Sequence, residues 1–261
     1  MELIPVNDGK YEEYETLLLE RDQALKEAGQ TWTAYLQNFG RLLTDLYEVK
    51  IDCIKCKKTI AYYQNAINHG GVVDANAMQE YLRKEMAEYY ANLKKMLADS
   101  ERCRKAKDST AYEVQRSKTL YRRLAKLLHP DINPETDRHE ELLELWNRIT
   151  YAYALNDIKA LSELEVLVRK ALKDLGLGRI KIEIPDIEDR IEELKKEIEQ
   201  IRTTTPYIYR DLLNDDEEVE KKKQELAEEL EEYRSYKEKL NAVIEGMLAG
   251  GQITLQWHMN G

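Results

Sequence analysis

The sequence contains few residues that interrupt helices and few that build disulfide scaffolds. Its 261 residues include five Pro, eleven Gly, three Cys and a single Phe. Because Pro and Gly are scarce, long stretches are free to form helix. An odd, small number of Cys fits reduced thiols better than a disulfide framework. The composition therefore predicts an all-α protein with free cysteines.

Two further absences concern membranes and export. No apolar run approaches the roughly 20 residues that a membrane-spanning helix needs. The first residues, Met1 to Pro5, lack the basic segment and the apolar stretch of a secretion signal. We therefore expect a cytoplasmic protein that has no membrane partner.

Positive charge is in deficit. Lys and Arg number 40 against 50 Asp and Glu, which gives a net charge of −10. A nucleic-acid-binding surface needs a basic excess to neutralise phosphates, so nucleic acid is not an expected partner. The sequence also has no P-loop, no dinucleotide-binding fingerprint and only four His, none of them in a catalytic pattern. We expect neither enzymatic activity nor a cofactor.

One concentrated basic surface is nevertheless present, on a predicted helix that ends at His129. Thr110 and Glu113 form a capping-box pattern before this helix. Its leucines occupy one face at helical spacing, and cations fill the adjoining sector. These cations are Arg116, Lys118, Arg122, Arg123 and Lys126. One face of the helix is therefore expected to pack, and another to offer positive charge.

The basic helix is predicted to stop at the tripeptide His129-Pro130-Asp131. Pro130 cannot continue a helix, and it disfavours helical geometry at His129. Pro134 keeps the loop from returning to helix before a second helix begins. The apolar positions of that helix face back toward the first one: Leu142, Leu145, Trp146, Ile149, Ala152 and Tyr153. The segment is therefore a predicted helical hairpin that displays His129 and Asp131 at its tip.

Two segments beside the tripeptide match a known pattern. They are Tyr121-Arg122-Arg123-Leu124-Ala125 and Ala152-Tyr153-Ala154-Leu155. Together with His-Pro-Asp, they make the hairpin resemble the second helix, loop and third helix of the J domain of the DnaJ family. The likeness covers about residues 116 to 160. It implies an all-α J-domain-like element inside a larger helical bundle.

In the DnaJ family this element docks on a DnaK-type ATPase chaperone and stimulates its ATP hydrolysis. The resemblance therefore implies a DnaK-type partner and a co-chaperone role. The basic helix would steer an acidic partner surface, and Asp131 would contact a basic group of the ATPase. The residues implied in docking are Arg122, Arg123, Lys126, His129, Pro130 and Asp131, and Lys118 lies on the same basic face.

The sequence departs from the family in three respects. The usual first J-domain helix carries Tyr-x-x-Leu-Gly, and the corresponding region from Arg104 to Val114 has no such pattern. The zinc region with four CxxCxGxG repeats and the Gly/Phe-rich linker are also absent. The chain is therefore identified as a divergent member of the family. We expect the long helix before the hairpin to replace the packing of the missing first helix.

Helical spacing extends over most of the remaining chain. One helix is predicted from Tyr11 to Ala28 with an interruption at Gly29, and a second from Thr31 to as far as Asn68. A third, capped by Asp74, should pack on the second as an antiparallel pair. The predicted domains are an N-terminal helical region (1–115), the J-domain-like hairpin (116–160), a connecting helix (161–178) and a C-terminal region (179–261).

The C-terminal region combines two patterns. Apolar residues alternate in two short stretches, Ile180 to Ile184 and Ile253 to Trp257, which predicts two strands that pair with each other. Two heptad helices lie between them, one carrying Ile187, Ile191, Leu194, Ile198 and Ile201, the other Val219, Leu226, Tyr233, Leu240 and Met247. We predict an antiparallel coiled-coil hairpin, an arm for a client protein or for self-association.

Two alternatives remain. Cys53-Ile-Lys-Cys56 has the spacing of a metal or redox motif, but a zinc site wants four ligands and no suitable second His follows His69. Small buried side chains on one helix face are the simpler interpretation, and no metal is expected. The alternative function is a helical scaffold in which the J-like hairpin is only structural and the arm mediates assembly.

Overall fold

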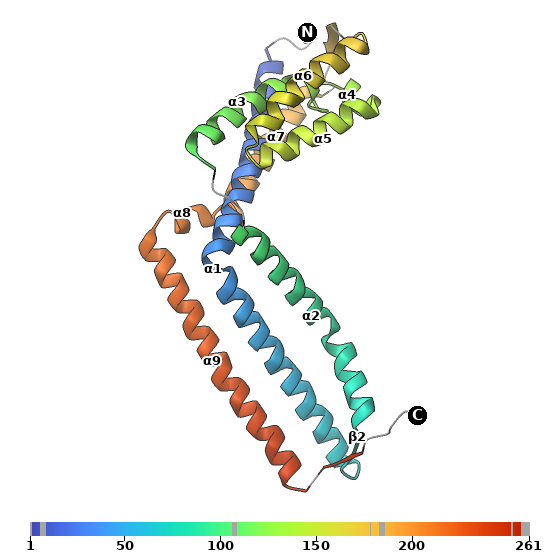
Figure 1. Ribbon diagram of the computed structural model, residues 1–261, viewed down its shortest axis with the longest axis vertical. Coiled ribbons are helices and arrows are strands. Elements are labelled where there is room, and N and C mark those ends of the chain that lie inside the picture. The colour runs from blue at the N-terminus through green and yellow to red at the C-terminus, as the bar shows by residue number, and fades with distance from the viewer. Residues whose placement is uncertain are drawn as a thin grey trace. The chain divides into compact units, whose positions relative to one another are not determined.

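The computed structural model describes residues 2–5, 9–105, 109–177, 179–182, 186–251 and 253–256 (Figure 1). These residues are mostly helical, which confirms the all-α class. They form two compact units that interleave along the chain. The hairpin unit combines Met1–Thr31 with Lys107–Ile208, and the three-helix unit combines Trp32–Ala106 with Tyr209–Gly261. The consecutive division predicted from sequence, with boundaries near 115 and 178, differs from this arrangement.

Helix α1 (Tyr11–Asn68) contributes to both units. The predicted interruption at Gly29 is wrong, because one glycine inside a helix costs only about 1 kcal/mol and side chains before and after it pack. The helix does end where the glycine pair predicts. Gly70 and Gly71 have φ values of 107° and 78°, and the Gly71 N–H donates to the carbonyl of Ala66 at 2.8 Å.

The three-helix unit is built from three long helices, the second part of α1, α2 (Ala75–Lys105) and α9 (Asp216–Ala249), and also contains the short α8 (Tyr209–Leu213). In Figure 1, α1 lies between α2 and α9. The predicted antiparallel packing of α2 on α1 is confirmed, since Met86 and Ile51 share one buried cluster.

The two heptad helices do not pair with each other as predicted. Helix α7 (Ile187–Thr203) belongs to the hairpin unit, where Ile191 packs against Tyr14 of α1. Helix α9 belongs to the three-helix unit, where Leu226 packs in one cluster with Leu46 of α1. A heptad repeat specifies an apolar stripe but not its partner. Helix α1 offers an apolar face to each stripe, so the predicted coiled-coil arm is replaced by two separate packings on α1.

Two parallel ladders of short strands complete the units. Strand β1 (Glu2–Pro5) pairs with β3 (Arg179–Ile182), and β2 (Val72–Asp74) pairs with β4 (Thr254–Gln256). The predicted pairing of the two C-terminal stretches with each other is therefore wrong. Their partners have only three or four residues, too few for an alternating pattern to reveal them. The predicted positions 184 and 257 lie outside the described residues.

The hairpin consists of α3 (Ala111–Leu128), the short α4 (Glu135–Arg138) and α5 (Glu140–Ala154). The predicted capping box between Thr110 and Glu113 is present at the start of α3. Buried apolar side chains from α3 and α5 meet in one core. They include Leu120, Leu124, Leu128, Leu142, Trp146 and Ile149.

Helix α6 (Ile158–Asp174) is part of this core, although the sequence indicated only a connecting helix. Its Leu161 and Val168 are fully buried among the side chains of α3 and α5. The preceding helix α2, which we expected to replace the first J-domain helix, lies in the other unit. Helix α6 therefore supplies the third packing layer of the hairpin.

Shortening a buried side chain of α6 should destabilise the hairpin unit. We expect Leu161→Ala to lower the free energy of unfolding by about 2–5 kcal/mol, because it leaves a cavity in the core. Val166→Ala is the control on the same helix, since Val166 is 67% exposed; its effect should stay within about 0.5 kcal/mol. Urea unfolding followed by circular dichroism measures both, and equal effects would contradict this role of α6.

Candidate functional site

The tip of the hairpin is a tight, internally bonded loop. The amide of His129 donates to the Ala125 carbonyl at 2.8 Å and closes α3. Asn133, fully buried, donates from its side chain to the carbonyl of Leu127 at 2.8 Å and accepts from the amide of Glu135 at 3.1 Å. The predicted turn is confirmed. Asn133, which the sequence analysis did not single out, holds the loop together.

His129 is buried rather than displayed, with only 4% of its surface exposed. The amide of Asp131 donates to its Nδ1 at 3.1 Å. Its Nε2 lies 3.5 Å from Oδ2 of Asp22 and 3.3 Å from Nη2 of Arg21, both on α1. The ring of Trp146 lies beside the imidazole, with centroids 4.9 Å apart. The expectation that the turn displays His129 is therefore wrong.

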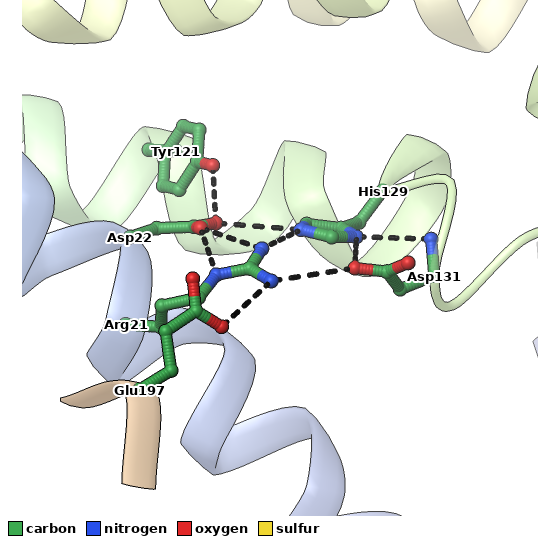
Figure 2. A network of polar contacts seen from close by, with 6 residues as sticks. All are labelled: Arg21, Asp22, Tyr121, His129, Asp131 and Glu197. Atoms are coloured by element: carbon green, nitrogen blue, oxygen red, sulfur yellow. Dashed lines mark hydrogen bonds and ion pairs between the residues drawn. The ribbon is translucent and has the colours of Figure 1, made fainter. Parts of the chain in front are cut away.

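Asp22 is the centre of a polar network that joins α1 to the tip (Figure 2). The hydroxyl of Tyr121 donates to its Oδ2 at 2.7 Å, and Nη2 of Arg21 donates to its Oδ1 at 3.0 Å. Burial opposes ionisation of Asp22, but the bonds from His129 and Tyr121 and the charge of Arg21 outweigh it, so its pKa is lowered. Burial and the nearby Asp22 raise the pKa of Tyr121, which stays a hydrogen-bond donor.

Arg21 reaches the other charged group of the tip. Figure 2 shows its guanidinium between the carboxylates of Asp22, Asp131 and Glu197. Its Nη1 lies 3.6 Å from Oδ2 of Asp131 and 3.9 Å from Oε2 of Glu197, on α7. The side chain of Asp131 is still 41% exposed. The carboxylate that was expected to meet a basic group of a partner already meets one from its own chain.

The basic face of α3 is only partly free. Lys126 forms an ion pair of 2.5 Å with Glu15 of α1, and Arg123 one of 3.2 Å with Glu165 of α6. Arg122 is exposed and forms no ion pair with any residue that the structure describes. Lys118 and Pro130 are half-buried. Helices α1 and α6 thus neutralise part of the surface that sequence analysis assigned to a partner.

Lys26 fixes α1 at the far end of the hairpin. Its Nζ donates to Oδ1 of Asn156 at 2.5 Å and to the hydroxyl of Ser117 at 3.4 Å, and it lies 3.5 Å from the centre of the Tyr153 ring. Burial, together with the charge of Lys118, lowers the pKa of Lys26 to about 8. No local pattern indicates this contact, since Lys26 and Asn156 are 130 residues apart.

The cysteine motif lies in the three-helix unit. Sγ of Cys53 donates to the carbonyl of Tyr233 at 3.6 Å, and Sγ of Cys56 to Oδ1 of Asn241 at 3.3 Å. Burial raises the pKa of both thiols, which favours the protonated form. Within the described part of the chain, no three His, Cys, Asp or Glu residues gather as metal ligands. No described helix has the length and apolar character to cross a membrane.

The lowered pKa of Lys26 makes stability depend on pH. The native state holds this proton less tightly than the unfolded chain, so stability should rise with pH between about 8 and the ordinary value of 10.5. The slope cannot exceed about 1.4 kcal/mol per pH unit for one group. Lys26→Met should lack this rise. Urea unfolding at pH 7.5 and 9.5 measures the difference, and the same pH dependence in both proteins would contradict it.

Comparison with known proteins adds no relative on which to base a function. No protein-family model matches the chain, no curated protein matches it, and no solved structure matches it. The likeness to the DnaJ family therefore depends on the hairpin residues alone.

Proposed function

We propose that the chain is a J-domain-like co-chaperone that recruits a DnaK-type chaperone and stimulates its ATP hydrolysis. The observation that supports this function best is the hairpin itself. A basic helix, a loop closed by Asn133 and a returning helix share one core, and the His-Pro-Asp tripeptide stands at the turn between them. The chain would act in the cytoplasm, and its other helices would bind or orient a client protein.

The exposed groups of the hairpin give this proposal a docking surface. Arg122 is exposed, and the side chains of Arg123 and Lys126 are 48% and 54% exposed despite their ion pairs. They would attract an acidic surface of the ATPase. Asp131, 41% exposed, would form a charge-assisted bond to a basic group of that partner. His129 would act indirectly, because its Nδ1 accepts the amide of Asp131 and so sets the loop.

A second function is favoured by one observation. His129 is only 4% exposed and faces Asp22 of α1. In a helical scaffold, the hairpin would be retained as a fold element, and the same network would serve to fasten α1. Such a protein would not accelerate ATP hydrolysis by any chaperone.

Single-turnover ATP hydrolysis by a DnaK-type chaperone from the same organism distinguishes the two functions. We expect the wild-type chain to raise the hydrolysis rate, and His129→Gln and Asp131→Asn each to abolish most of the increase, because both alter the loop that would meet the ATPase. His139→Gln and Asp137→Asn are matched controls just beyond the loop, outside the proposed docking surface. Both should retain the stimulation.

Folding must be checked in each variant by circular dichroism, since His129 is buried. Stimulation that falls steeply with rising salt would support docking through the basic face. The absence of stimulation from a folded wild-type chain and from a variant with an accessible tip would contradict the co-chaperone function and leave the scaffold.

A further inference from the structure

Part of the surface that would bind the chaperone, around Lys126, His129 and Asp131, is occupied by the chain's own first helix. We propose that the segment Glu15–Lys26 of α1 is an autoinhibitory cover, which must leave the hairpin before a DnaK-type partner can dock. This inference rests on the proposed function, and it names the regulation of the same site.

The cover matches the charges of the hairpin. Glu15 places a carboxylate on Lys126, one of the cations that would attract the partner. Arg21 places a guanidinium by Asp131, where a basic group of the partner is expected. Asp22 places Oδ2 of its carboxylate 3.5 Å from Nε2 of His129. An acidic surface with one basic group is what the hairpin was expected to recognise, and α1 supplies both.

The packing of α1 on the tip loop leaves no room there for a partner protein. Only 4% of the surface of His129 is exposed, and Ile132, in the same loop, is fully buried. Ile132 is inserted in an apolar cluster with Tyr14 and Leu18 of α1 and Ile191 of α7. A partner that binds the His-Pro-Asp tripeptide could not reach His129 while this packing persists.

The hairpin does not depend on the cover for its own core. The buried side chains of that core come from α3, α5 and α6, and α1 adds only the partly buried Leu19 at its edge. At the tip, Ile132 packs on Tyr14 and Leu18 of α1. Elsewhere the contacts of α1 with the hairpin are largely polar, such as the bonds of Gln23 to Tyr153 and of Lys26 to Asn156. Departure of α1 would therefore expose Ile132 and the tip, while α3, α5 and α6 would keep their shared core.

Helix α7 would move with α1. Arg202 of α7 forms an ion pair of 2.8 Å with Glu20, and Lys195 one of 3.1 Å with Glu13. Glu13 and Glu20 form these ion pairs with α7 and none with the hairpin among the described residues. The pair α1–α7 thus has its own interactions and forms one cover.

Charge reversal on α1 tests the proposal. The variant Glu15→Lys with Arg21→Glu places like charges against Lys126 and Asp131 and leaves the sequence of the hairpin unchanged. The control is Glu12→Lys with Arg41→Glu, which makes the same changes on exposed positions of the same helix. If the reversal variant fails to fold, Glu15→Gln with Arg21→Gln provides the same comparison with a milder loss of charge.

Two readouts separate the cover from the proposed function. The first, independent of any chaperone, is the rate at which diethyl pyrocarbonate modifies His129, followed by mass spectrometry. The second is single-turnover ATP hydrolysis by the DnaK-type chaperone at a subsaturating concentration of the chain. We expect the reversal variant to exceed wild type about tenfold in both, the control to match wild type, and an added His129→Gln to abolish the gain in ATP hydrolysis.

Each other outcome has a definite meaning. If His129 does not become more reactive, α1 is not removable in this way and the proposal is overturned. If His129 becomes reactive but the variant stimulates no more than an active wild-type chain, autoinhibition is wrong while the co-chaperone function stands. If neither protein stimulates although His129 is reactive, the co-chaperone function itself is wrong, and the inference falls with it.

Discussion

The hairpin unit depends on one buried carboxylate. Asp22 is ionised in a largely enclosed site because Tyr121, His129 and Arg21 each offer it a donor or a charge. An unpaired carboxylate there would be costly to bury, so the three partners and Asp22 require one another. Through them, the end of α3, the tip loop and the first helix are held in one arrangement.

Local rules predicted the hairpin well. The turn follows from Pro130, the start of α3 from Thr110 and Glu113, and the core face of α5 from its helical spacing. Each of these signals lies within a few residues of the structure that it specifies. The residues of the tip could therefore be predicted from the sequence, and so could the division of the preceding helix into an apolar and a basic face.

Long-range partners were not predictable in the same way. Arg21 and Asp22 are ordinary charged residues of a long helix, and Tyr121 is 99 residues away from Asp22. The stripes of α7 and α9 were recognised, but which surface they cover depends on α1. The prediction of strand pairing was wrong for the same reason. The parallel partners of β3 and β4 are distant in the sequence and very short. The spacing of apolar residues specifies which face of a helix is buried. The element that covers this face depends on the shape and charge of the whole chain.

Four of the α1 residues that contact the hairpin have a regular spacing. Glu15, Asp22 and Lys26 are seven and four residues apart, so they fall on one narrow stripe of an α-helix, and Leu19 lies between them on the same side. An insertion or deletion of one residue inside this stripe would rotate its two parts by about 100° relative to each other and separate the contacts. The stripe therefore constitutes a readable pattern, Glu-x3-Leu-x2-Asp-x3-Lys.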